Sequence, residues 1–77
     1  METLLRTIVV ELVEDPDAVE IQVDEPNEEG VSVLHLHVAP ADMGRVIGKQ
    51  GRIAKAIRQV MRAASIRRNV KISVDID

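Results

Sequence analysis

Apolar residues recur at helical spacing in two stretches of the chain. The first predicts a helix from about Thr3 to Val13, with an apolar stripe formed by Leu4, Leu5, Ile8, Val9 and Leu12. Asp15-Pro16 ends this helix, because the residue before a proline is steered away from helical angles. The second predicts a helix from about Arg52 to Ile66, with a stripe formed by Ile53, Ile57, Val60, Met61 and Ala64.

Strict alternation of apolar and polar residues predicts three strands, at about 19–24, 31–38 and 70–76. The polar turn from Pro26 to Gly30 is short, so the first two strands should form an antiparallel hairpin. In the second strand Leu34, Leu36 and Val38 share one face. The other face carries Val33, His35 and His37.

A short helix from Ala41 to Ile47 is expected after Pro40, since proline suits the first turn of a helix. The element order is then helix, strand, strand, helix, helix, strand. The two-helix connection is long enough for a crossover, so the second and third strands can be parallel. We predict an α+β fold of two layers, with three helices on one face of a three-stranded mixed sheet. The 77 residues are expected to form one domain, 1–77, with a modest core.

Composition narrows the function classes. The chain has no cysteine, so disulfides and thiolate metal sites are excluded. It has no Phe, Tyr or Trp, which disfavours proteins that read bases by aromatic stacking. No apolar run approaches the ~18 residues of a membrane span, and the acidic start at Glu2 does not look like a secretion signal. We therefore expect a cytoplasmic protein without membrane contact.

Charge is segregated along the chain. Residues 1–42 carry eleven carboxylates and one arginine, whereas residues 43–77 carry nine lysines and arginines and two carboxylates. The formal net charge of −3 alone argues against a generic polyanion binder. Halves of opposite sign nevertheless indicate one face that attracts polyanions and one that repels them.

A glycine-bracketed turn, Gly48-Lys49-Gln50-Gly51, lies in the basic half. Glycine permits backbone angles closed to other residues and lets a ligand approach the backbone closely. The turn opens a helix, whose unpaired N–H groups and dipole favour a bound anion, and Lys49 and Arg52 add positive charge. We interpret it as a loop that grips a phosphate backbone.

Two other interpretations of the turn are available. Gly48 could simply end one helix and Gly51 begin the next, as glycine often does. A nucleotide-binding P-loop would require the pattern G-x-x-x-x-G-K-S/T. Between Gly44 and Gly48 the spacing is too short, and Gln50 follows Lys49, so the P-loop fails on spacing and on the magnesium ligand.

The side of the second long helix opposite its apolar stripe is basic, and carries Arg52, Lys55, Arg58 and Arg62. A solvated face is the ordinary explanation of such a stripe. However, Arg52 and Lys55 lie in the first turn, where the helix dipole disfavours each cation by about 0.3–1 kcal/mol. A bound phosphate would reverse this penalty, which favours a functional role.

Catalysis and metal binding find little support. His35 and His37 form an H-x-H pair, but with no cysteine and no third histidine we expect ordinary surface or interface histidines and no metal site. The serines, Ser32, Ser65 and Ser73, have no motif that pairs them with a histidine and an acid. We therefore predict that the chain is not an enzyme and has no catalytic residue, cofactor or small-molecule substrate.

With helices on both sides of Gly-x-x-Gly between two strands, the chain resembles the KH domain in its type II order. The run from Ala39 to Arg58, APADMGRVIGKQGRIAKAIR, is similar to the small single-domain bacterial KH proteins of the KhpA (YlqC) family. The resemblance covers essentially the whole chain. One departure from wider KH usage is Ala54, where many KH helices carry a larger aliphatic residue.

The resemblance implies a single-stranded RNA-binding protein that acts as an RNA chaperone in post-transcriptional regulation. KH loops clamp about four nucleotides at the Gly-x-x-Gly turn. The RNA would lie between the glycine-loop helices and the sheet edge, with Val38 among the aliphatics that support the bases. The candidate RNA-binding residues are Arg45, Ile47, Gly48, Lys49, Gln50, Gly51, Arg52, Ile53 and Lys55.

The resemblance also implies a homodimer, or a heterodimer with a larger Jag-type (KhpB) KH protein, and links to cell-wall homeostasis and cell-length control. The alternative function is a protein–protein interaction module for which RNA contact is secondary. In that case the Met61 face or the open side of the sheet would pair with another KH-type protein. Small residues that allow close helix approach support this alternative, namely Ala54, Ala56, Ala63 and Ala64.

Overall fold

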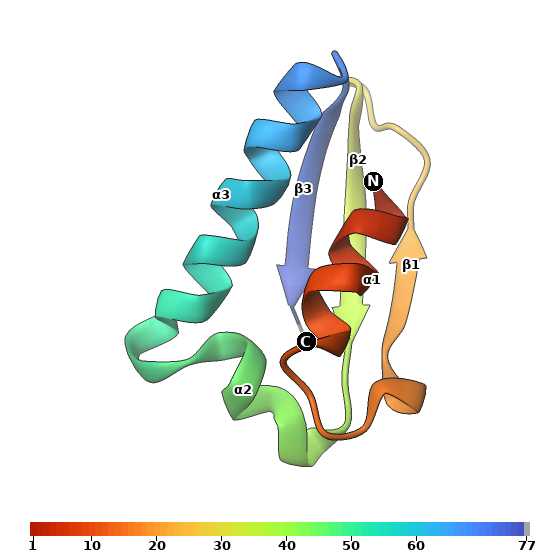
Figure 1. Cartoon of the computed structure of the whole chain (residues 1–77). Helices are drawn as coiled ribbons and strands as arrows, with labels where there is room; N and C mark the ends of the chain where they lie inside the picture. Colours follow the sequence, from red (N-terminus) through yellow and green to blue (C-terminus); the bar gives the residue numbers. More distant parts are fainter. Residues whose placement is uncertain (77) are drawn as a thin grey trace.

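Helices cover one face of a three-stranded sheet in the computed structural model, which describes residues 1–76 (Figure 1). In chain order the main elements are α1 (Glu2–Val10), β1 (Glu20–Val23), β2 (Val31–His37), α2 (Met43–Ile47), α3 (Arg52–Arg67) and β3 (Lys71–Ile76). Three short 3₁₀ turns are η1 (Pro16–Ala18), η2 (Pro40–Asp42) and η3 (Lys49–Gly51). The predicted α+β fold with a mixed sheet is confirmed.

The sheet has the strand order β1-β2-β3. β1 and β2 are antiparallel, with Ile21 opposite Leu36, as their short connection predicts. β2 and β3 are parallel, with Leu34 opposite Val74, because α2 and α3 provide the crossover between them. β3 is therefore an edge strand, and α3 lies alongside it (Figure 1).

The core lies between the helices and the sheet. It consists of Leu5, Val9, Val19, Leu34, Leu36, Val46, Ile57, Met61 and Val74. The alternation in β2 directs Leu34 and Leu36 toward the helices, as predicted. Met61 itself has no exposed surface and belongs to this core, whereas Val60 of the same stripe is 51% exposed, so pairing through this face of the helix stays a prediction.

Helix and strand boundaries differ from the predicted ones by one to three residues at several ends. α1 ends at Val10, three residues before the predicted Val13, although the amides of Leu12 and Val13 still bond to the carbonyl of Val9. The chain then turns away, because the next two amides, of Glu14 and Asp15, bond to a side chain on another segment. The short helix becomes α-helical only at Met43, since Pro40–Asp42 forms the 3₁₀ turn η2.

Candidate functional site

The turn between α2 and α3 depends on its glycines. Gly48 has φ 75° and ψ 175°, and Gly51 has φ 74° and ψ 14°. Both of these combinations of φ and ψ are readily adopted only by glycine. A Cβ on residue 48 would also lie 2.5 Å from Cγ1 of Ile53. Gly48 is therefore required by the packing of Ile53 as well as by the backbone.

Gln50 is strained in the same turn. It has φ 59° and ψ 26°, which is uncommon for a residue with a side chain. Such angles cost of order 1–3 kcal/mol and cluster at functional positions. The turn thus projects Lys49 and Gln50 outward, and both side chains are exposed.

The amides of the turn are partly occupied. The N–H of Gly48 donates to the carbonyl of Gly44 at 2.9 Å, and the N–H of Gly51 donates to the carbonyl of Gly48 at 3.2 Å. The expectation of open N–H groups is therefore wrong for the two glycines, and it stays a prediction for the amides of Lys49 and Gln50.

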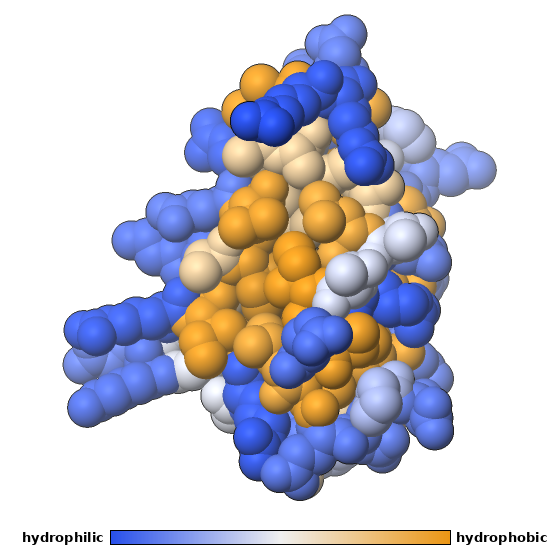
Figure 2. Space-filling model, in the orientation of Figure 1, coloured by the Kyte–Doolittle hydropathy of each residue, from blue (hydrophilic) through white to orange (hydrophobic). Residues whose placement is uncertain are grey.

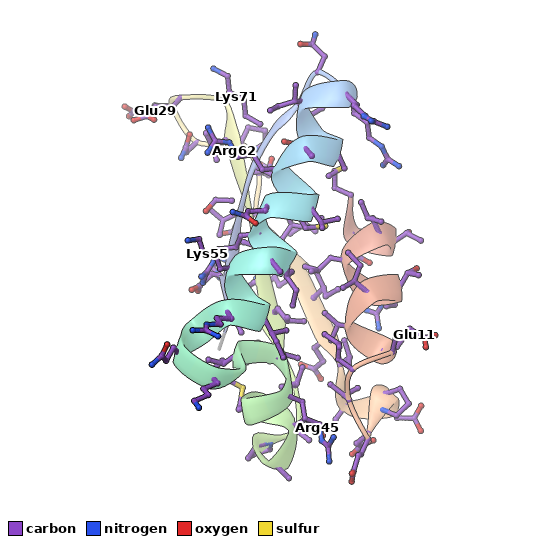
Figure 3. All side chains as sticks on the ribbon, turned by 60° about the vertical axis from the view of Figure 1, so that its left-hand side comes forward. Glu11, Glu29, Arg45, Lys55, Arg62 and Lys71 are labelled. Carbon is purple, nitrogen blue, oxygen red and sulfur yellow. The ribbon has the colours of Figure 1, made fainter. Side chains whose placement is uncertain are left out.

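Three of the predicted cations gather near the turn. Lys49, Arg52 and Lys55 are exposed, and in the part of the chain that the structure describes no carboxylate pairs with them. Nη2 of Arg52 donates to Oε1 of Gln50 at 3.3 Å, which links the turn to the first residue of α3. Figure 3 shows Lys55 on the side of α3 that faces away from α1. These side chains form a positive surface beside the turn.

Arg45 does not join this surface. Its guanidinium pairs with the carboxylate of Glu14, and its Nε lies 3.4 Å from Oδ1 of Asp42. In Figure 3 it lies beside α2, toward the segment that follows α1, and away from Lys55. The structure therefore separates Arg45 from the other predicted site residues.

Two isoleucines frame the turn. Ile47 ends α2 and is 37% exposed, whereas Ile53 is half-buried over Gly48. Val38, the other predicted support for bases, is partly buried and packs against the core. The apolar surface at the turn consequently belongs mainly to Ile47.

Sequence reasoning missed the role of Asp42. Its side chain is almost completely buried, and its two oxygens accept the amides of Glu14 and Asp15, each at 3.1 Å. This carboxylate ties the segment after α1 to the segment that begins α2. An acidic residue two positions after Pro40 indicates the start of a helix. The two amides that Asp42 accepts lie 27 and 28 residues away in the sequence, so no local signal could reveal them.

His35 lies between two carboxylates on the open face of the sheet. Nε2 is 2.7 Å from Oδ2 of Asp24, and Nδ1 is 3.2 Å from Oδ2 of Asp75. The pKa of His35 is raised above 6.5, first by the hydrogen bond to Asp24 and then by that to Asp75.

Among residues 1–76, no group of three or more His, Asp or Glu side chains could hold a metal ion. No described helix has the length and apolar character needed to cross a membrane.

Comparison with known proteins places the chain in a family. The family model described as KhpA/KhpB, KH domain, matches residues 2–76. A protein of Clostridium acetobutylicum named RNA-binding protein KhpA is 54% identical over 76 residues, which cover 99% of each chain. Proteins of the same name from Clostridium perfringens and Caldanaerobacter subterraneus are 49% and 47% identical, also over 99% of each chain.

One solved structure has the same fold. The crystal structure of Aquifex aeolicus Era Y63A bound to GDP.AlF4- superposes with a TM-score of 0.64 at 17% identity. The match covers 95% of this chain and 28% of that one.

The prediction that this chain is not an enzyme agrees with the full-length match to KhpA. The chain belongs to the KhpA/KhpB family of KH-domain proteins.

Proposed function

We propose that this protein binds single-stranded RNA by clamping the sugar–phosphate backbone at the turn from Gly48 to Gly51. The observation that carries the proposal is the glycine turn, which exposes Lys49 and Gln50 next to three cations without carboxylate partners among the described residues. The full-length relatives named RNA-binding protein KhpA support it. KH domains bind about four unpaired nucleotides at this loop.

Each part of the turn would have a separate task. The amides of Lys49 and Gln50 donate to phosphate oxygens, because an anion suits the N-terminal end of α3. Lys49, Arg52 and Lys55 supply the positive charge, and Ile47 and Ile53 contact sugars and bases. Arg45 contributes only if phosphate displaces Glu14 from its guanidinium.

The finer functions implied by the family resemblance belong to the same proposal. A short clamp with exposed, non-aromatic contacts binds weakly and releases readily, which suits an RNA chaperone. We also predict that the protein is located in the cytoplasm. Its roles in post-transcriptional regulation, in cell-wall homeostasis and in cell-length control are predictions of the same kind. A second RNA clamp on a dimer partner would raise the affinity through effective concentration.

A second candidate function is pairing with another KH protein, either a second copy or a larger KhpB-type chain. Apolar side chains gather between α1 and α3, on the face that Figure 2 presents. They include Ile8, Leu12, Ile53, Ala56 and Val60, and Val60 is 51% exposed. An exposed apolar surface of this kind is typical of a protein–protein contact. Sedimentation of the wild type and of Val60→Glu tests it, and pairing should be lost in the variant.

Replacement of Lys49 and Gln50 by Asp tests RNA binding. Two carboxylates in the turn repel phosphate, so the affinity for a 12-nucleotide unpaired RNA should fall by about 1.5–3 kcal/mol, or tenfold or more. Fluorescence anisotropy measures the affinity, and circular dichroism and thermal melting verify that the fold is kept. Duplex RNA of the same length should bind more weakly than the single strand.

A matched control removes the same charge at the other end of α3. Arg67→Asp with Arg68→Gln makes the same change in net charge as Lys49→Asp with Gln50→Asp, and both arginines are exposed. This control should lose much less affinity than the loop variant. Equal losses would mean that binding follows net charge alone, and an unchanged affinity of the loop variant would exclude the turn as the clamp.

A further inference from the structure

β1 is an edge strand whose outer side is open. The sheet order places β2 on one side of β1, and within residues 1–76 no strand lies on the other side (Figure 1). The N–H of Asp24 donates to the carbonyl of Val33 at 2.9 Å, so the backbone groups of Asp24 face β2. Because these groups alternate in direction along a strand, the N–H and C=O groups of Ile21 and Val23 face away from β2. The outer edge of β1 can therefore pair with a further strand.

The start of this edge is already occupied. Nη1 of Arg6 donates to the carbonyl of Val19 at 3.2 Å, so the carbonyl that precedes β1 has a donor. At the opposite edge of the sheet, Nε of Arg58 donates to the carbonyl of Val74 in β3 at 3.2 Å. A protein strand that joins the sheet would therefore pair with residues 21–23 of β1.

An apolar hollow adjoins the same edge, on the side of the sheet that carries the helices. It lies at the start of α1, and its lining includes Met1, Glu2, Val23, Leu34, Val70 and Ile72. Val23 is 47% exposed and Val70 is 46% exposed, so the helices leave these apolar side chains uncovered. When a strand is added to a sheet edge, backbone hydrogen bonds supply affinity and hollows of this kind select alternate side chains. The hollow favours an aliphatic side chain next to Val23.

The open face of this edge is acidic. Glu20 and Asp24 alternate with Ile21 and Val23, so their side chains lie on the face without helices, and both are exposed. Asp24 is bonded to His35, whereas no cation of the described residues pairs with Glu20. The turn after β1 adds three exposed carboxylates, those of Glu25, Glu28 and Glu29. Negative charge along this edge repels nucleic acid and attracts a basic partner.

Charge also determines which strand can pair with β1. Two antiparallel copies of β1 joined through Ile21 and Val23 would place Glu20 of one copy opposite Asp24 of the other. Like charges directly opposite one another destabilise a strand pair, and charges on an edge strand ordinarily prevent such self-pairing. Because both charges here have the same sign, the edge rejects a second copy and accepts a strand that carries lysine or arginine at the facing positions.

We propose that β1 binds an extended segment of another protein, in which basic and aliphatic residues alternate. The segment adds a fourth strand to the sheet and is bonded to the backbone of Ile21 and Val23. Its aliphatic side chains lie on the side of the hollow, and its basic side chains lie opposite Glu20 and Asp24. α3 lies beside β3 at the other edge of the sheet, so this contact leaves the glycine turn accessible (Figure 1). The proposal does not depend on RNA binding at the turn.

A short peptide tests the backbone pairing. A capped Lys-Val-Thr-Val-Lys peptide should bind, shift the NMR signals of the amides of Ile21 and Val23, and slow the exchange of these amides with solvent. The same peptide with both valines N-methylated keeps the charge but lacks two donors, so it should bind about tenfold more weakly. Unshifted signals at Ile21 and Val23 at millimolar peptide, or equal binding of the two peptides, would overturn the proposal.

Charge reversal at Glu20 tests the chemistry of the partner. Glu20→Lys should weaken binding of the lysine peptide by about fivefold and strengthen binding of Glu-Val-Thr-Val-Glu by a similar factor. Glu11→Lys is the matched control, because it makes the same change in net charge at an exposed position just after α1, and it should change neither affinity by more than about twofold.

Two outcomes of these experiments would place the peptide elsewhere. Equal effects of Glu20→Lys and Glu11→Lys would mean that the peptide follows net charge alone. Peptide-induced shifts at Val60 in place of Ile21 and Val23 would assign the peptide to the apolar surface between α1 and α3. Either result would overturn the proposal.

Discussion

Gly48 lies directly beneath the side chain of Ile53, and a Cβ at position 48 would approach three carbons of that isoleucine within 2.9 Å. The glycine is therefore part of the packing that joins α2 to α3, as well as part of the turn. Any substitution at Gly48 changes the fold and the candidate site together.

Gly48→Ala should destabilise the protein by about 2–4 kcal/mol, since it combines a positive φ with a steric clash. Gly44→Ala is the matched control, because Gly44 lies inside α2 and nothing lies within 4 Å of an added Cβ. It should stabilise the protein by about 0.5–1 kcal/mol. Urea unfolding measures the change in the free energy of unfolding for both variants. Equal changes would contradict the packing role of Gly48.

Asp42→Ala should destabilise the protein by about 2–4 kcal/mol, because it leaves two amides without their charged acceptor. Asp42→Asn keeps the shape and one acceptor oxygen, so it should cost less. Asp17→Ala provides the control at an exposed carboxylate outside these bonds and should change stability by less than about 0.5 kcal/mol. A loss in Asp42→Ala no larger than in Asp17→Ala would mean that water replaces the carboxylate.

The stability of the protein should depend on the ionisation of His35. Only the doubly protonated ring can donate to Asp24 and Asp75 at once. Because its pKa is raised in the folded state, the stabilisation is complete below about pH 6.5 and is lost as the pH rises through the folded pKa. The melting temperature should therefore fall over this range.

His35→Gln should remove this step in the pH profile of the melting temperature. NMR titration of the imidazole protons gives the pKa of His35 directly, and His37→Gln assigns the two histidine signals. A pKa of His35 at or below 6.5 would contradict the contacts with Asp24 and Asp75.

Met61→Ala should cost about 2–5 kcal/mol, because the side chain is fully buried between α3 and the sheet. Val60→Ala removes a neighbouring apolar side chain that is 51% exposed, and should cost about 0.5 kcal/mol or less. Thermal unfolding at low protein concentration measures the loss of stability in each of the two variants. Similar losses in both variants would mean that Val60 is covered, as in a tightly paired dimer.

The layered fold follows from local patterns in the sequence. Period-two alternation located β2 and β3, and the stripe on α3 identified Ile57 and Met61 as buried. The glycine spacing located the turn. The contacts of Asp42 and Arg45 could not be predicted, because they join segments that are distant in the sequence and leave no periodic signal. For the same reason the sequence could not show that Lys71 of β3 lies in one groove with Arg62 of α3.

α3 presents three differently composed sides: Met61 is buried, Val60 lies on the apolar surface toward α1, and Arg62 lines a groove toward β3 together with Lys71. At about 100° per residue, Val60 and Arg62 point about 200° apart around the helix axis, so they face nearly opposite directions. Occupancy of the apolar side consequently leaves the basic side accessible. Two copies joined through α1 and α3 would each keep this basic side exposed, so the pair would present two positive surfaces at a fixed separation.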